Sequence, residues 1–228
     1  MLKPGIVTRS TAALAALVFG TVAAAAHPHV WIKNRSDVIF NDDGKITGLI
    51  VEWAFDENYS TDATEGLDTD GDGSFSSSEL EVLTRENLTA LKEYDYFVYS
   101  KLDGKKVSYG DVTEFGQRFS QGVLKMHFVV PFSEPVDPTR GAFTYAIYDP
   151  SFFIAIDYPD ASAVAAIGKK PANCTLEMKP VSGDQETDQA REMLSEKSPD
   201  WQPETVEDFG TLFAQPVNVV CKPKTASK

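Results

Sequence analysis

The segment VWIKNRSDVIFNDDGKITGLIVEWAF, residues 30–55, decides the type of fold. β-branched and aromatic side chains are frequent in residues 30–40 and 45–55. The residues between them, NDDG, are typical of a tight turn between two antiparallel strands. The segment therefore predicts a β-hairpin at the start of the folded part of the chain.

The β-rich pattern continues beyond this hairpin. Leucines recur at helical spacing between residues 77 and 94, and two more polar segments also have helical features. We expect an α+β fold dominated by β-structure: a β-sandwich-like domain with an inserted loop and helix, and with peripheral C-terminal helices. The expected strands are residues 94–102, 105–109, 123–132, 142–157, 174–178 and 217–221, and the expected helices are residues 77–94, 184–196 and 204–213.

The first 26 residues have the pattern of a secretory signal peptide. Lys3 and Arg9 give it a basic start, residues 12–22 form an apolar run, and three alanines end it as a cleavage site. The apolar run is too short to cross a membrane. We expect an exported protein without a membrane anchor, with one mature β-rich domain over residues 27–222 and a basic tail over residues 223–228.

Composition and cysteine usage limit the classes of partner and of chemistry. The chain has 21 Lys and Arg against 34 Asp and Glu, a net charge of −13, so nucleic acid and anionic lipid would repel it. In an exported chain, its two cysteines, Cys174 and Cys221, predict a disulfide. The sequence has no GxSxG, HExxH or P-loop pattern, and we expect a protein that is not an enzyme.

The sequence DTDGDGSFSSSE, residues 68–79, matches the twelve-residue calcium loop of an EF-hand. Oxygen ligands recur at alternate positions, a glycine allows the sharp turn at position 6, and a glutamate closes the loop at position 12. A single hand in an exported protein is expected to bind calcium weakly, with a Kd of about 10⁻⁴ to 10⁻³ M, and to serve stability. The insertion spans about residues 58–94, and its expected calcium ligands are Asp68, Asp70, Asp72, Ser74, Ser76 and Glu79.

The histidines indicate a second, different metal site. The chain has three, and two of them, His27 and His29, follow the expected cleavage point. Cleavage after Ala26 would give His27 both a free amine and an imidazole, which suit zinc, copper or nickel. Pro28 has no amide N–H, so the square-planar amino-terminal copper or nickel site is blocked.

Further ligands for such a site would come from elsewhere in the fold. His127 lies on the more polar face of the strand expected at residues 123–132. Two carboxylates, Asp149 and Asp56, are also candidates. The alternative interpretation is an ordinary surface or core histidine for His127, and a frayed, solvated terminus for the pair His27 and His29.

Three segments of the chain resemble a known family. HPHVWI (residues 27–32), VEWAFDENYS (residues 51–60) and YAIYDPSFFIAI (residues 145–156) are similar to an exported family of otherwise undefined function, domain of unknown function family 1007. The resemblance covers roughly residues 27–180. It implies a periplasmic protein that accompanies inner-membrane permeases of the nickel/cobalt type, with zinc acquisition in some members. It also implies metal contacts at His27 and His29 and draws attention to Asp149.

Three functions follow as hypotheses. The first is a binding protein that holds one transition-metal ion, Zn²⁺ before Ni²⁺, Co²⁺ or Cu²⁺, and exchanges it with a permease. The second is a calcium-stapled β-module for adhesion or ligand binding, without transition-metal affinity. The third is a copper enzyme with a histidine brace made by His27 and His127.

Overall fold

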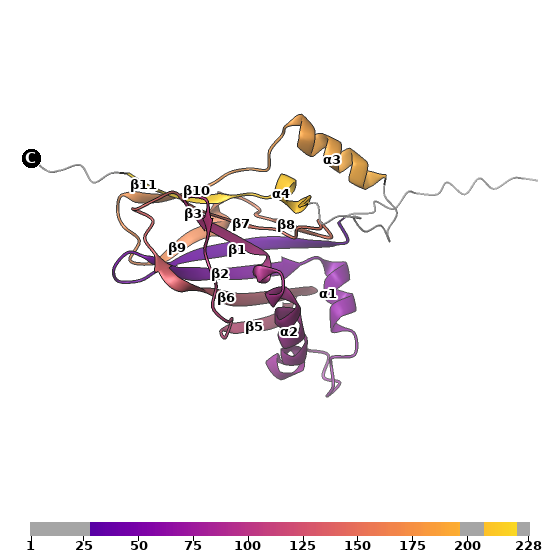
Figure 1. The fold of residues 1–228 in the computed structure, drawn as a ribbon. Helices are drawn as coiled ribbons and strands as arrows, with labels where there is room; N and C mark the ends of the chain where they lie inside the picture. The colour runs from indigo at the N-terminus through magenta and orange to yellow at the C-terminus, as the bar shows by residue number, and fades with distance from the viewer. Residues whose placement is uncertain (1–27, 197–207, 223–228) are drawn as a thin grey trace, which may run out of the picture.

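The computed structural model describes residues 28–196 and 208–222 (Figure 1). The expected signal peptide, His27 and the expected basic tail therefore lie outside the described residues. Within those two ranges, no helix combines the length and the hydropathy that a membrane span requires.

The described chain forms two β-sheets that share one hydrophobic core, as expected for a β-dominated α+β fold (Figure 1). Sheet A has six strands in the order β5-β6-β2-β1-β8, with β9 also paired to β1. Its strands are β1 (Val30–Phe40), β2 (Ile46–Phe55), β5 (Phe115–Ser120), β6 (Val123–Val136), β8 (Ile154–Asp157) and β9 (Val164–Gly168). Sheet B has the order β10-β11-β7-β3-β4, with β3 (Val98–Leu102), β4 (Lys105–Lys106), β7 (Phe143–Ile147), β10 (Cys174–Met178) and β11 (Val217–Cys221).

The predicted hairpin is confirmed, and its first strand lies inside sheet A. β1 pairs antiparallel with β2 on one side, and parallel with both β8 and β9 on the other. The turn is held by Asn41, whose Oδ1 accepts hydrogen bonds from the backbone N–H groups of Asp43 and Lys45 at 3.0 and 2.9 Å. Gly44 completes it with a φ of 74°, a conformation that favours glycine.

A buried polar contact joins the two sheets through the core. Ser36 on β1 is fully buried, and its Oγ hydrogen-bonds both the Tyr145 hydroxyl on β7 and the Tyr158 hydroxyl beyond β8, each at 2.7 Å. Burial raises the pKa of Tyr158 to about 12 and that of Tyr145 well above its usual value, so both tyrosine hydroxyls stay neutral. The surrounding core is apolar and includes Ile32, Leu49, Phe128, Phe143 and Ile147.

Helices pack on two sides of this sandwich. α1 (Glu57–Thr64) and α2 (Ser77–Lys92) follow β2 and lie against β6 and β5, whereas α3 (Gln185–Ser195) and α4 (Gly210–Phe213) lie on the far side (Figure 1). Two short 3₁₀ turns, at Asp95–Phe97 and Ala161–Ala163, precede β3 and β9. The helices expected at residues 77–94 and 184–196 are confirmed. Of the helix expected at residues 204–213, the described part is helical from residue 210.

Several strand predictions need correction. The strand expected at residues 94–102 begins only at Val98, because Asp95, Tyr96 and Phe97 all have positive φ. The strand expected at residues 105–109 ends at Lys106. The strand expected at residues 142–157 is divided into β7 and β8 by a turn. β5 and β9 were not predicted, because FGQRFS and VAAIG lack a strong alternating pattern.

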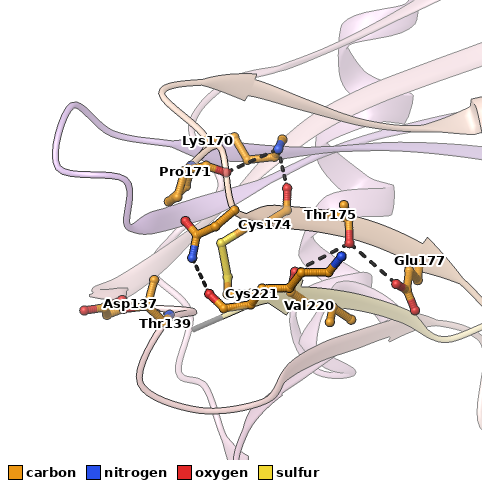
Figure 2. Close-up of a disulfide and its surroundings, with 11 residues drawn as sticks. Asp137, Thr139, Lys170, Pro171, Cys174, Thr175, Glu177, Val220 and Cys221 are labelled. Carbon is orange, nitrogen blue, oxygen red and sulfur yellow. Dashed lines mark hydrogen bonds between the residues drawn. A yellow bond between two sulfur atoms is a disulfide. The ribbon is translucent and has the colours of Figure 1, made fainter. Parts of the chain in front are cut away.

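The predicted disulfide is present at the end of sheet B (Figure 2). Cys174 and Cys221 lie directly opposite each other on the antiparallel strands β10 and β11. Lys170 Nζ donates to the Cys174 carbonyl oxygen (Figure 2). Next to the two cysteines in sequence, the Lys222 N–H donates to the Asn173 carbonyl oxygen at 2.9 Å. Disulfides of this kind are typical of oxidising compartments.

The Ser36 contact gives a prediction for stability. We expect Ser36→Ala to lower the free energy of unfolding by about 1–3 kcal/mol, because two buried tyrosine hydroxyls lose their partner. The matched control is Ser100→Ala, a serine of sheet B that is 1% exposed and whose hydroxyl has no hydrogen-bond partner among the described residues. Urea unfolding followed by tryptophan fluorescence measures both. Equal losses in the two variants would contradict the prediction.

Candidate metal sites

Segments that are far apart in the sequence meet at the start of β1. The His29 N–H donates to the Phe153 carbonyl oxygen at 2.8 Å, which joins the start of β1 to the turn before β8. On the other side, the Trp31 N–H donates to Asp56 Oδ2, and the Asp56 N–H donates to the Trp31 carbonyl oxygen, both at 2.9 Å. The pairing of β1 with β2 and β8 therefore gathers all three segments that carry the family resemblance.

Aromatic residues lie close to His29 at the start of β1. Its imidazole is half-buried and stacks on the Phe153 ring, with ring centroids 4.6 Å apart and an angle of 29° between the planes. Trp31 lies two residues further along β1, on the same face of the strand. The Trp31 and Phe153 side chains are 50% and 40% exposed. The imidazole is therefore oriented by its contacts and bordered by exposed aromatic surface.

Asp149 organises the turn that ends at Phe153. Its side chain is 6% exposed, and its carboxylate accepts hydrogen bonds from the Ser151 N–H at 2.9 Å, the Ser151 hydroxyl at 2.8 Å and the Ile154 N–H at 3.0 Å. The turn is closely covered by Gly210, where a Cβ atom would lie 1.9 Å from the Asp149 carbonyl oxygen. Asp149 thus positions the residue on which His29 stacks.

Asp56 connects the start of β1 to the insertion. Its Oδ2 accepts from the Trp31 N–H, and its Oδ1 accepts from the Tyr59 N–H at 2.9 Å as the N-cap of α1. A side-chain oxygen at this position stabilises the first turn of a helix. Both carboxylate oxygens therefore hold structure around the candidate site.

His127 lies in a different part of sheet A. It is exposed on β6 opposite Glu52, which pairs with Arg35 on β1. Arg35 is six residues further along β1 than His29, a distance of about 20 Å at the rise of a strand. The structure therefore does not bring His29, His127 and Asp149 into one group of ligands.

Among the described residues, the acidic loop supplies the one group of three or more side chains that could hold a metal ion. Ligand atoms of Asp68, Asp70 and Glu79 lie within 4.8 Å of one another. Asp68 accepts from the N–H groups of Gly71 and Gly73 at 2.8 and 3.0 Å. Gly73, at position 6, has the left-handed φ of 80° that the sharp turn requires.

Glu79 closes over this loop and lies in the first turn of α2. Its carboxylate accepts hydrogen bonds from the N–H and hydroxyl of both Thr69 and Ser76, at 2.7 to 2.9 Å, and Ser76 caps α2 in return. These donors, Ser76 first, lower the pKa of Glu79 from 4.5 to about 2. The carboxylate therefore stays charged until the pH falls to about 2. Phe75 packs edge-on against Phe119 of β5, which fastens the loop to sheet A.

The site residues Asp72, Ser74 and Ser76 lie in the same loop but are not part of the three-carboxylate group. Asp72 Oδ1 accepts from the Ser74 N–H at 2.7 Å. Position 7 of such a loop binds through its backbone carbonyl and position 9 often through water, so these residues would complete the set of oxygens.

Comparison with known proteins identifies similar chains of undefined activity. A family model described as a protein of unknown function, DUF1007, matches residues 12–221. An uncharacterized protein of Haemophilus influenzae is 24% identical over 211 residues, which cover 90% of this chain and 96% of that protein. An uncharacterized 15.5 kDa protein in the trpE 3′ region of Spirochaeta aurantia is 30% identical over 98 residues, which cover 43% of this chain and 69% of that protein.

The turn before β8 gives a second prediction. We expect Asp149→Ala to lower the free energy of unfolding by about 1–3 kcal/mol, because buried donors lose their acceptor. The NMR signals of the His29 ring should also shift as the Phe153 ring moves.

Asp160→Ala is the matched control, because Asp160 holds Ser162 in the same Asp-x-Ser arrangement but is exposed. Asp160→Ala should lower the free energy of unfolding by less than Asp149→Ala does, and it should leave the NMR signals of the His29 ring unchanged. Unchanged His29 signals in Asp149→Ala would contradict the positioning role.

Proposed function

The chain belongs to the DUF1007 family, and we propose that it is an exported, periplasmic protein that binds one Zn²⁺ ion near its mature N-terminus and exchanges it with an inner-membrane permease. The observation that carries the proposal is the meeting of the three resemblance segments around His29. β1 begins there, immediately after the expected cleavage point, so the terminal amine and both N-terminal imidazoles would lie in one place.

The ligand set favours exchange over permanent binding. His29 supplies an oriented imidazole, and His27 would add a second imidazole and an amine, nitrogen ligands that suit Zn²⁺, Ni²⁺, Co²⁺ or Cu²⁺. Such a set leaves a coordination position open for water or for a ligand from a partner. The metal is the cargo in this proposal, and the reaction is ligand exchange.

The surface beside His29 supports docking of a partner. Phe153 stacks on the imidazole, Trp31 follows two residues after His29, and both aromatic residues are exposed. Aromatic residues are enriched at protein interfaces and often contribute most of the binding energy. A permease loop that covers these two rings would reach the metal at the same time.

The acidic loop supports a separate, structural calcium site. Calcium prefers several hard oxygen ligands in a flexible arrangement, which the carboxylates of Asp68, Asp70 and Glu79 can provide. The loop joins α1 to α2, and α1 is capped by Asp56 next to the start of β1. Bound calcium would therefore stiffen the insertion that supports the N-terminal site.

Zinc affinity tests the first part of the proposal. We expect His27→Ala and His29→Ala each to weaken zinc binding at least about tenfold, or about 1.4 kcal/mol, because each removes an imidazole ligand. Competition with a chromophoric chelator, on protein exported and processed in the cell, measures the affinity.

His127→Ala is the matched control and should keep the wild-type affinity. An equal loss in His127→Ala would move the site to β6. Full affinity in a His27/His29 double variant would overturn the proposal, and calcium binding without zinc binding would favour the calcium-stapled β-module.

Thermal and urea stability tests the calcium site. Calcium at about 100 times its Kd should raise the free energy of unfolding by about 2.7 kcal/mol, because only the folded loop binds it. Glu79→Gln should abolish this increase, whereas Glu81→Gln, on the exposed face of α2, should retain it. An undiminished increase in Glu79→Gln would contradict the assignment.

A further inference from the structure

The outer face of sheet A carries a second binding surface, and we propose that it binds a small oxyanion with two or more negative charges. The surface is a row of side chains that crosses four strands in register: Lys33 on β1, Ala54 on β2, Lys125 on β6 and Arg118 on β5. We call it the cationic row. It is independent of the metal sites described above.

The geometry of the row suits a ligand with separated charges. Neighbouring strands lie about 4.8 Å apart, so the backbones of Lys33 and Lys125 are about 10 Å apart. Ala54 lies between them in the register, its side chain ends at the Cβ atom, and all three residues line the same pocket. Arg118 continues the row beyond Lys125.

The row lies in a pocket with a volume of about 280 Å³. One wall comes from Pro159, Ser162 and Ala163 near the 3₁₀ turn before β9. On another side lies the His127 ring, which packs over Gly116 so closely that a Cβ there would be 2.7 Å from His127 Cε1. The cations therefore line a concave surface.

The charge of the row is opposite to that of the whole chain. The chain has a net charge of −13, yet the pocket is lined by four Lys and Arg side chains and one carboxylate, Glu52. Arg35 uses its guanidinium to contact Asp37 at 3.5 Å. Among the described residues, Lys33, Lys125 and Arg118 form no ion pair, although Asp157 lies opposite Lys33 on β8.

This arrangement works against folding unless an anion is bound. Lys125 and Arg118 lie directly opposite each other, and like charges in that position destabilise a sheet. A bound oxyanion would place negative charge beside Lys125 and Arg118, so the attraction of each side chain to the anion would replace their mutual repulsion. The Arg118 guanidinium suits the paired oxygens of a carboxylate or phosphate, and the lysines act as point charges on either side of Ala54.

Calorimetric titration with pyrophosphate and with citrate tests the proposal. The wild-type chain should bind at least one of them, and Lys125→Gln should weaken that binding at least about tenfold. Lys105→Gln is the matched control, because Lys105 is exposed on β4 of the other sheet. It should bind as the wild type does. No binding of either anion, or an equal loss in Lys105→Gln, would overturn the proposal.

A second variant separates binding from folding. Ala54→Glu places a carboxylate between the lysines, so we expect it to abolish anion binding while the thermal midpoint stays the same or rises. Lys125→Gln should also leave the midpoint unchanged or raise it, because it removes the repulsion from Arg118. A fall in the midpoint for both variants, with anion binding retained in Ala54→Glu, would show that the row is structural and overturn the proposal.

The source of the oxyanion is tested with vesicles. Lipid headgroups offer phosphate too, but a chain of net charge −13 is repelled from an anionic membrane surface. We therefore expect no sedimentation with phosphatidylglycerol vesicles under conditions where the free anion binds. Sedimentation with vesicles in the absence of binding to free pyrophosphate or citrate would overturn the proposal.

Discussion

The pairing of β1 with strands on both of its sides is the constraint on which the rest of the structure depends. β2 occupies one edge of β1, and β8 and β9 share the other. This pairing brings the turn before β8 and the start of α1 to the first residues of β1. It also gives β1 two different faces: Ser36 points into the core toward sheet B, whereas Trp31 and Lys33 lie on the outer side.

Much of the fold could be predicted because its signals are local. The hairpin of β1 and β2, the helix α2 and the cysteine pair each follow from residues close in sequence or from a simple count. The parallel pairing of β1 could not be predicted, because it joins residues 30–40 to residues 154–168 and leaves no local pattern. β7 and β8 are separate strands because Asp149 accepts hydrogen bonds that form a turn between them. β3 begins later than expected because the three residues before it have left-handed backbone conformations.

The candidate sites also differ in how far local sequence patterns indicate them. The acidic loop could be located from sequence because its candidate oxygen ligands all lie within twelve consecutive residues. The N-terminal histidines stay a predicted site, and strand spacing alone does not indicate that His29 and His127 lie far apart. The cationic row is spread over four strands, and Arg118 lies on β5, whose residues lack a clear strand pattern. Its members are far apart in the sequence, so no local sequence pattern indicates it.

The parallel partners of β1 also have a consequence for the order of folding. A ribosome makes β1 early, at residues 30–40, but β8 and β9 exist only after residues 154–168 have been translated. Until then β1 can form at most its hairpin with β2. Folds dominated by such distant pairings form slowly. Sheet A therefore cannot be completed before residue 168 has been made, and sheet B also needs β11 at residues 217–221, so the core that the two sheets share closes only late in synthesis.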